Sequence, residues 1–176
     1  MQASPGSDKG LAHNSASCRL VVRKNRGFTE VLPFVVEGLE MGQQIVALAA
    51  PACLKELARG ISETGLKPDS LLRNGRLVFL AAPECLSLFS NGHDPFQRGP
   101  LRRNGSIMRW ISDWSWAYGN GTHPERISEY QHNIHEVVRP MTSISLCTVH
   151  CENLQRTSLL AILAEHRRAA KAAVSA

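Results

Sequence analysis

The sequence lacks the motifs by which the common nucleotide-binding and hydrolytic α/β proteins are recognised. The turn after its first apolar run is Lys24-Asn25-Arg26-Gly27, which is neither a G-x-G-x-x-G turn nor a GxxxxGK[ST] phosphate loop. A single glycine cannot supply the successive backbone N–H donors that wrap a phosphate. No G-x-S-x-G elbow follows any apolar run. We therefore predict a non-catalytic protein that carries no cofactor.

Long apolar runs are also missing. No run approaches the roughly 18–20 residues that a membrane span needs, and the first residues, MQASPGSDKG, contain no apolar stretch typical of a signal peptide. The chain has five cysteines, an odd number: Cys18, Cys53, Cys85, Cys147 and Cys151. Most of them lie inside apolar runs. This pattern favours free thiols in a reducing compartment over disulfides. We expect a cytoplasmic protein with no membrane partner.

Basic residues are scattered rather than gathered into a stripe. The formal net charge is +5, which is mild for 176 residues, and neither helix-turn-helix nor zinc-finger spacing is present. A solvated basic surface explains this distribution, so nucleic acid is not an expected partner.

Apolar runs and helical patterns alternate through residues 17–176, which we predict to form one domain. The runs that predict strands are 18–23, 44–50, 76–80, 106–111 and 143–149. Apolar residues at helical spacing predict helices over 28–42, 51–64, 68–73, 124–138 and 157–173. This order predicts a three-layer α/β fold, with a mostly parallel central sheet of about five strands flanked by helices. Residues 1–16, rich in Ser, Gly, Ala and Asn, are expected to be a disordered leader.

The tetrapeptide Asp113-Trp114-Ser115-Trp116 follows the fourth predicted strand. Ligands of parallel sheets bind beyond the carboxyl ends of the strands. The Asp113 carboxylate would anchor a polar group of a ligand there, and the two indoles would cover an apolar one. The alternative is that the tryptophans only pack beneath the following helix, and the sequence leaves both open.

Two further groups of residues could carry chemistry. His132 and His135 share a helix face with Glu129, and a metal site could add His123 and Glu136, but no second motif completes a ligand set. We therefore predict no metal. Cys147 and His150 end the fifth predicted strand, where a thiol beside an imidazole could be a nucleophile. Because strand neighbours alternate between faces, we favour a packed, structural Cys147.

Six segments resemble, in order and spacing, the MEDS domain, the sensory domain of methanogens and methylotrophs. They lie within residues 18–166 and comprise Pro33–Leu39 with Gly42, Ser70–Leu77, Met108–Ala117, Glu129-Tyr130, Leu146-Cys147 and Leu159–His166. The chain departs from that family where the shorter Asp113 stands for a glutamate and where Tyr130-Gln131 stands for Tyr-Glu. The resemblance implies a degenerate RecA/KaiC-like fold that has lost its phosphate loop.

The resemblance also implies a role. Members of that family resemble sensors of small, hydrocarbon-derived ligands, and they occur alone or joined to histidine kinases and DNA-binding regulators. We therefore expect a small organic ligand and a signalling partner such as a histidine kinase or regulator, and we leave homodimer formation open.

The leading hypothesis is a bacterial small-molecule-sensing domain in signal transduction or transcriptional regulation. The expected ligand-binding residues are Asp113, Trp114, Trp116, Arg109, Tyr130, Cys147 and His150. One alternative is a protein-interaction module that has lost its ligand and presents exposed aromatics such as Trp110 or Trp114. Another is an enzyme that uses Cys147 or a histidine-bound metal.

Overall fold

A computed structural model of the chain describes residues 17–23, 28–82, 84–86, 107–119, 122, 124–138, 141, 143–150, 162 and 164. The predicted leader over 1–16 lies outside the described residues. So does the predicted last helix over 157–173, except for Ile162 and Ala164, which are helical.

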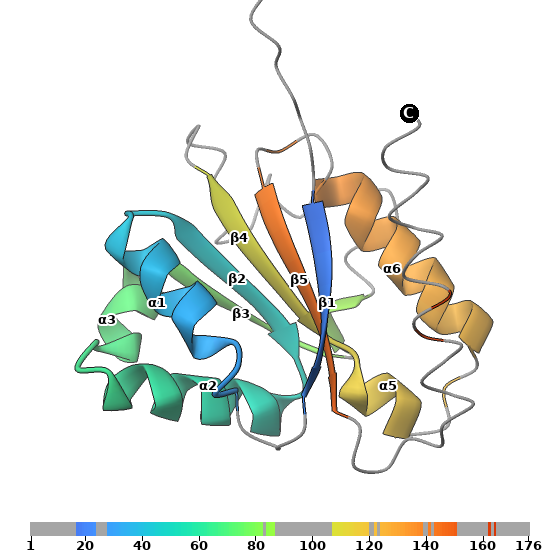
Figure 1. The fold of residues 1–176 in the computed structure, drawn as a ribbon, viewed down its shortest axis with the longest axis horizontal. Helices are drawn as coiled ribbons and strands as arrows, with labels where there is room; N and C mark the ends of the chain where they lie inside the picture. The colour runs from blue at the N-terminus through green and yellow to red at the C-terminus, as the bar shows by residue number, and fades with distance from the viewer. Residues whose placement is uncertain are drawn as a thin grey trace, which may run out of the picture.

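Five strands form one parallel sheet (Figure 1). They are β1 (Ser17–Arg23), β2 (Gln44–Ala49), β3 (Leu77–Ala81), β4 (Met108–Asp113) and β5 (Ser143–His150). Their order across the sheet is β1-β5-β4-β2-β3, and every pairing is parallel. The apolar runs form strands because a parallel sheet is covered on both faces, so alternation with polar residues is not required. The prediction of a mostly parallel sheet of about five strands is confirmed.

All the described α-helices except α5 begin at or next to a proline, which pre-sets the backbone. The helices are α1 (Leu32–Glu40), α2 (Pro51–Glu63), α3 (Pro68–Arg73), α5 (Ser115–Gly119) and α6 (Pro124–Val138), with a 3₁₀ turn η1 (Glu84–Leu86). Proline lies at the first or second position of α1, α2 and α3, where its missing N–H costs nothing. Gly42 follows α1 with a φ of 75°, a conformation that glycine adopts without strain and that ends the helix.

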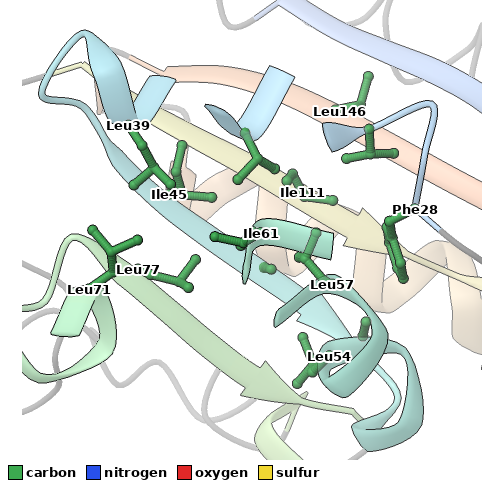
Figure 2. Packing of buried hydrophobic residues seen from close by; sticks show 14 residues of the cluster. Phe28, Leu39, Ile45, Leu54, Leu57, Ile61, Leu71, Leu77, Ile111 and Leu146 are labelled. Carbon is green, nitrogen blue, oxygen red and sulfur yellow. The ribbon is translucent and has the colours of Figure 1, made fainter. Parts of the chain in front are cut away.

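Side chains from alternate strand positions fill two cores, one on each face of the sheet. The α1-side core, shown in Figure 2, joins Ile45, Leu77, Ile111 and Leu146 of the sheet to side chains of α1, α2 and α3. The α6-side core joins Val46, Leu80 and Trp110 to side chains of α5, α6 and η1. Helices thus lie on both faces, which confirms the three-layer α/β fold.

Two local features differ from the predicted elements. The fourth strand runs to Asp113, two residues beyond its predicted end, and the helix α5 that follows it was not predicted. The predicted first helix over 28–42 is shorter, because residues 28–31 form a turn before α1. None of the helices within the described residues combines the length and apolar composition needed to cross a bilayer.

Candidate functional site

Three strands end side by side at one edge of the sheet. Arg23 is the last residue of β1 and lies opposite His150 of β5, while Asp113 ends β4 opposite Thr148. α5 and the start of α2 lie at this same edge (Figure 1). In open parallel α/β sheets this carboxyl edge is where ligands bind.

A buried ion pair spans this edge. Arg23 Nη2 donates to Asp113 Oδ1 at 2.7 Å, and the two side chains are only 1% and 0% exposed. The hydroxyls of Thr148 and Ser115 donate to the same carboxylate oxygen, each at 2.8 Å. Buried charges persist where they are paired and hydrogen-bonded. Asp113 meets both conditions at Oδ1, whereas its buried Oδ2 has no hydrogen-bond partner among the described residues. We call Arg23, Asp113, Ser115 and Thr148 the polar cluster.

The polar cluster is bordered by two groups from the α1 side. The guanidinium of Arg23 lies over the Phe28 ring, with 4.3 Å from Cζ to the ring centroid. The thiol of Cys53, in the first turn of α2, interacts with both Arg23 and Asp113. Burial, and next the Asp113 carboxylate, raises the pKa of the Cys53 thiol. The thiol is therefore held in its neutral form beside the ion pair.

The indoles belong mainly to the other face of the sheet. Trp114 comes one residue after Asp113, and its ring packs in the α6-side core with 2% exposure. Trp116, on α5, is half-buried against the same core, and the two ring centroids are 6.3 Å apart. Both indole nitrogens are buried, and neither donates a hydrogen bond to any described residue. The predicted grouping of Asp113 with the indoles is therefore split by the sheet, because successive side chains alternate between faces.

Two other predicted residues lie on the indole side. Tyr130 of α6 and Cys147 of β5 are half-buried and pack against the α6-side core. The Tyr130 hydroxyl accepts a hydrogen bond from Arg126 Nε at 3.0 Å. We call Trp114, Trp116, Tyr130 and Cys147, which share contact with this core, the aromatic subsite.

Arg109 is not brought together with these residues. It stands near the amino end of β4, where its Nε donates to Gln43 Oε1 at 2.6 Å. Its Nη1 donates to the Phe34 carbonyl and to Glu37 Oε2, each at 2.7 Å, and its Cζ lies 4.7 Å from the Phe34 ring centroid. These contacts fasten α1 to the sheet.

Sequence reasoning missed five residues of this edge as site residues: Arg23, Phe28, Cys53, Ser115 and Thr148. The available signal was a pair of opposite charges at the ends of two runs that predict parallel strands: Arg23 ends the first run, and Asp113 lies two residues after the fourth. His150 was predicted, and its backbone N–H donates to Ser115 Oγ at 2.7 Å.

The alternative hypotheses fare unequally. An interaction module was expected to expose Trp110 or Trp114, and this expectation is wrong, because both are 2% exposed within the α6-side core. Among the described residues no group of three or more His, Cys, Asp or Glu could hold a metal ion, although His123 and the His135 side chain lie outside that set. Alternation along β5 directs Cys147 and His150 to opposite faces.

Comparison with known proteins supplies the family. No curated protein matches the chain. The family model described as the methanogen/methylotroph, DcmR sensory domain (MEDS) matches residues 18–167. Because this match spans most of the chain, the protein belongs to the MEDS family of sensory domains.

Proposed function

We propose that the chain is a non-catalytic domain that senses a small organic molecule at the aromatic subsite. It would pass the signal to a partner protein in signal transduction or transcriptional regulation. Family membership supports a sensing role. The observation that carries the choice of site is the pair of buried indole N–H groups, on Trp114 and Trp116, that find no acceptor among the described residues.

Buried donors without acceptors are rare in native proteins, and each costs about 1–3 kcal/mol. The third tryptophan has an acceptor for its buried N–H, as is usual, because Trp110 Nε1 donates to Ser112 Oγ at 2.7 Å. A ligand that brings its own acceptor atom would remove the cost at Trp114 and Trp116.

The surroundings indicate the rest of the ligand. The rings of the aromatic subsite, together with the Cys147 side chain, offer apolar contact area. We therefore propose a small, mainly apolar molecule that carries one or two hydrogen-bond acceptors and no net charge.

The polar cluster would hold this site from the opposite face of the sheet. Asp113 and His150, both predicted as ligand residues, would act here through Ser115, which contacts the Asp113 carboxylate and the His150 backbone. Arg109 is left out of the proposed ligand set, because its side chain is held by α1 and by the segment between α1 and β2.

The test begins with the protein isolated from its own host and measured by native and then denaturing mass spectrometry. We expect an added mass that leaves on denaturation and that decreases in Trp116→Phe, which deletes one N–H and keeps an aromatic ring. Trp110→Phe is the matched control, because its N–H is already bonded to Ser112. An added mass retained equally by Trp114→Phe, Trp116→Phe and the control would place the ligand elsewhere.

A second measurement tests the proposed chemistry with defined probes. All three tryptophans of the chain lie within residues 110–116, so fluorescence excited selectively from tryptophan reports on this region alone. Cyclohexanone carries a carbonyl acceptor, and methylenecyclohexane has nearly the same shape without one. We expect cyclohexanone to perturb the fluorescence at lower concentration than methylenecyclohexane does, and we expect Trp116→Phe, but not Trp110→Phe, to remove this difference; collisional quenching by the carbonyl would survive both variants. Equal responses would contradict the assignment of the indole donors.

A further inference from the structure

The hydroxyl of Ser115 and the indoles of its two sequence neighbours lie on opposite faces of the sheet. In sequence it separates the two indole-bearing residues Trp114 and Trp116, which pack on the α6 side. Its hydroxyl nevertheless enters the polar cluster, where it donates to Asp113 Oδ1 at 2.8 Å. Ser115 Oγ also accepts from the His150 backbone N–H at 2.7 Å and from Arg23 Nη2 at 3.3 Å. One hydroxyl thus ties the first residue of α5 to the ends of three strands.

Hydrogen bonds fix the backbone next to Ser115. The Trp114 N–H donates to the Thr148 carbonyl at 2.9 Å, and the Trp114 carbonyl accepts from Ala117 and Tyr118 at the start of α5. We therefore expect a displacement of the Trp116 ring to move α5, which is joined to the buried charges through the Ser115 hydroxyl.

The path continues to the helices of the other layer. The Arg23 guanidinium lies over the Phe28 ring, and the Phe28 carbonyl accepts the N–H groups of Val31 and Leu32, where α1 begins. Both members of the same ion pair influence the pKa of the Cys53 thiol, in the first turn of α2. Three contacts therefore separate Ser115 from the amino end of α1, and two separate it from the amino end of α2.

We propose that Ser115 is the positioning residue through which occupancy of the aromatic subsite is transmitted to the Arg23–Asp113 pair and onward to α1 and α2. This inference rests on the proposed function, because it names the readout of that same site. The physical basis is the low dielectric around the pair, in which each hydrogen bond to the carboxylate is strong and its loss is felt by every other partner. Coupling of this kind is established by double-mutant cycles rather than by proximity.

The test measures one face while the other is perturbed, in the full-length chain and without any ligand. Trp116→Phe perturbs the aromatic subsite. The alkylation rate of Cys53 by iodoacetamide, followed by mass spectrometry of the Cys53 peptide, reports on the polar cluster from the α2 side. The cycle compares the wild-type chain, Trp116→Phe, Ser115→Ala and the double variant.

We expect Trp116→Phe to change the Cys53 rate at least about twofold when Ser115 is present, and to change it little when Ser115→Ala has removed the hydroxyl. Ser115→Thr keeps a hydroxyl and should restore the dependence. Trp110→Phe should change the rate by the same factor with and without the Ser115 hydroxyl. The Cys85 rate in the same digests controls for loosening of the α6-side core, because Cys85 packs against that core as Trp116 does.

The proposal is overturned if Trp116→Phe leaves the Cys53 rate unchanged in the otherwise native chain. It is equally overturned if the effect of Trp116→Phe is as large in Ser115→Ala, or if the Cys85 rate rises in parallel. The proposed function can fail separately: coupling between the faces with no ligand in native mass spectra would retain the relay and reject the sensing site.

Discussion

Arg23 and Asp113 form an ion pair 2.7 Å long, although 90 positions separate them in the sequence and their strands are not neighbours. β5 lies between β1 and β4, and the pair passes over it at Thr148, whose hydroxyl also donates to the Asp113 carboxylate. The pair therefore fastens three adjacent strand ends with a single carboxylate oxygen.

Removing one partner of this pair should be costly. We expect Arg23→Gln to lower the free energy of unfolding by about 3–5 kcal/mol, because it leaves the Asp113 carboxylate buried without a cation. Adding Asp113→Asn to Arg23→Gln should restore a substantial part of the loss, since no unpaired charge then remains. Urea unfolding curves measure both changes.

The matched control for Arg23 is Arg59, whose partners Glu56 and Glu63 are exposed like itself. Arg59→Gln should barely move the urea midpoint, because exposed pairs are screened by solvent. Equal effects of Arg23→Gln and Arg59→Gln would show that the buried pair contributes nothing special.

Gly38 should not accept a side chain. A Cβ there would lie 2.6 Å from Arg109 Cδ and 2.7 Å from Ile45 Cδ1, and Arg109 is held by Gln43 and Glu37. We expect Gly38→Ala to destabilise the fold by about 1–3 kcal/mol, as overpacking does. Gly60→Ala is the comparison, because its Cβ meets only the flexible end of Leu32. That variant should cost less in thermal unfolding, and the reverse order would refute the argument.

The thiol of Cys85 should be unreactive at neutral pH. Burial raises its pKa to about 12 from an ordinary value of 9.0. At pH 8 its thiolate fraction is then roughly 1,000-fold below that of an unperturbed thiol, and alkylation should be slowed accordingly. Peptide-resolved alkylation in native and urea-unfolded protein measures the ratio, and a native rate equal to the unfolded rate would exclude this burial.

The same shift links stability to pH. The folded chain keeps the Cys85 proton that the unfolded chain loses above about pH 9, so this contribution to stability is full below that pH. It should fade as the pH rises from about 9 toward about 12. Cys85→Ser should flatten the stability profile over that window, and an unchanged slope would speak against the assignment.

Ser112 should contribute to stability by accepting the hydrogen bond of the Trp110 indole. Its hydroxyl accepts the Trp110 indole N–H at 2.7 Å inside the α6-side core. Ser112→Ala removes this acceptor, and we expect a loss of about 1–3 kcal/mol in the free energy of unfolding, with a shifted fluorescence maximum. Ser62→Ala on the exposed face of α2 should do neither.

The elements were predictable because their signals are local. Apolar runs such as 44–50 form strands buried on both faces, and prolines such as Pro51 and Pro68 mark helix starts within a residue. Helix α5 escaped prediction because five residues carry too little periodicity to be distinguished from a loop.

The arrangement of the site was less accessible. Strand order depends on contacts between residues far apart in the sequence, and no residue of β1 indicates that its neighbour in the sheet is β5. Without that order, Arg23 reads as one more scattered basic residue rather than the partner of Asp113. The face of Trp114 depended on where β4 ends: because the strand runs through Asp113, alternation sends the carboxylate and the indole to opposite sides.

The strand order also governs how the chain reaches this structure. Within the described residues β1, the first strand synthesised, pairs only with β5, the last, and their register joins Ser17 to Ile144. Such a contact closes nearly the whole domain into a loop, so its entropic cost falls late in folding. On the ribosome the first strand must wait for the last, and Arg23 stays hydrated until then. The buried pair can therefore form only in a chain whose sheet is complete, with β5 placed between β1 and β4.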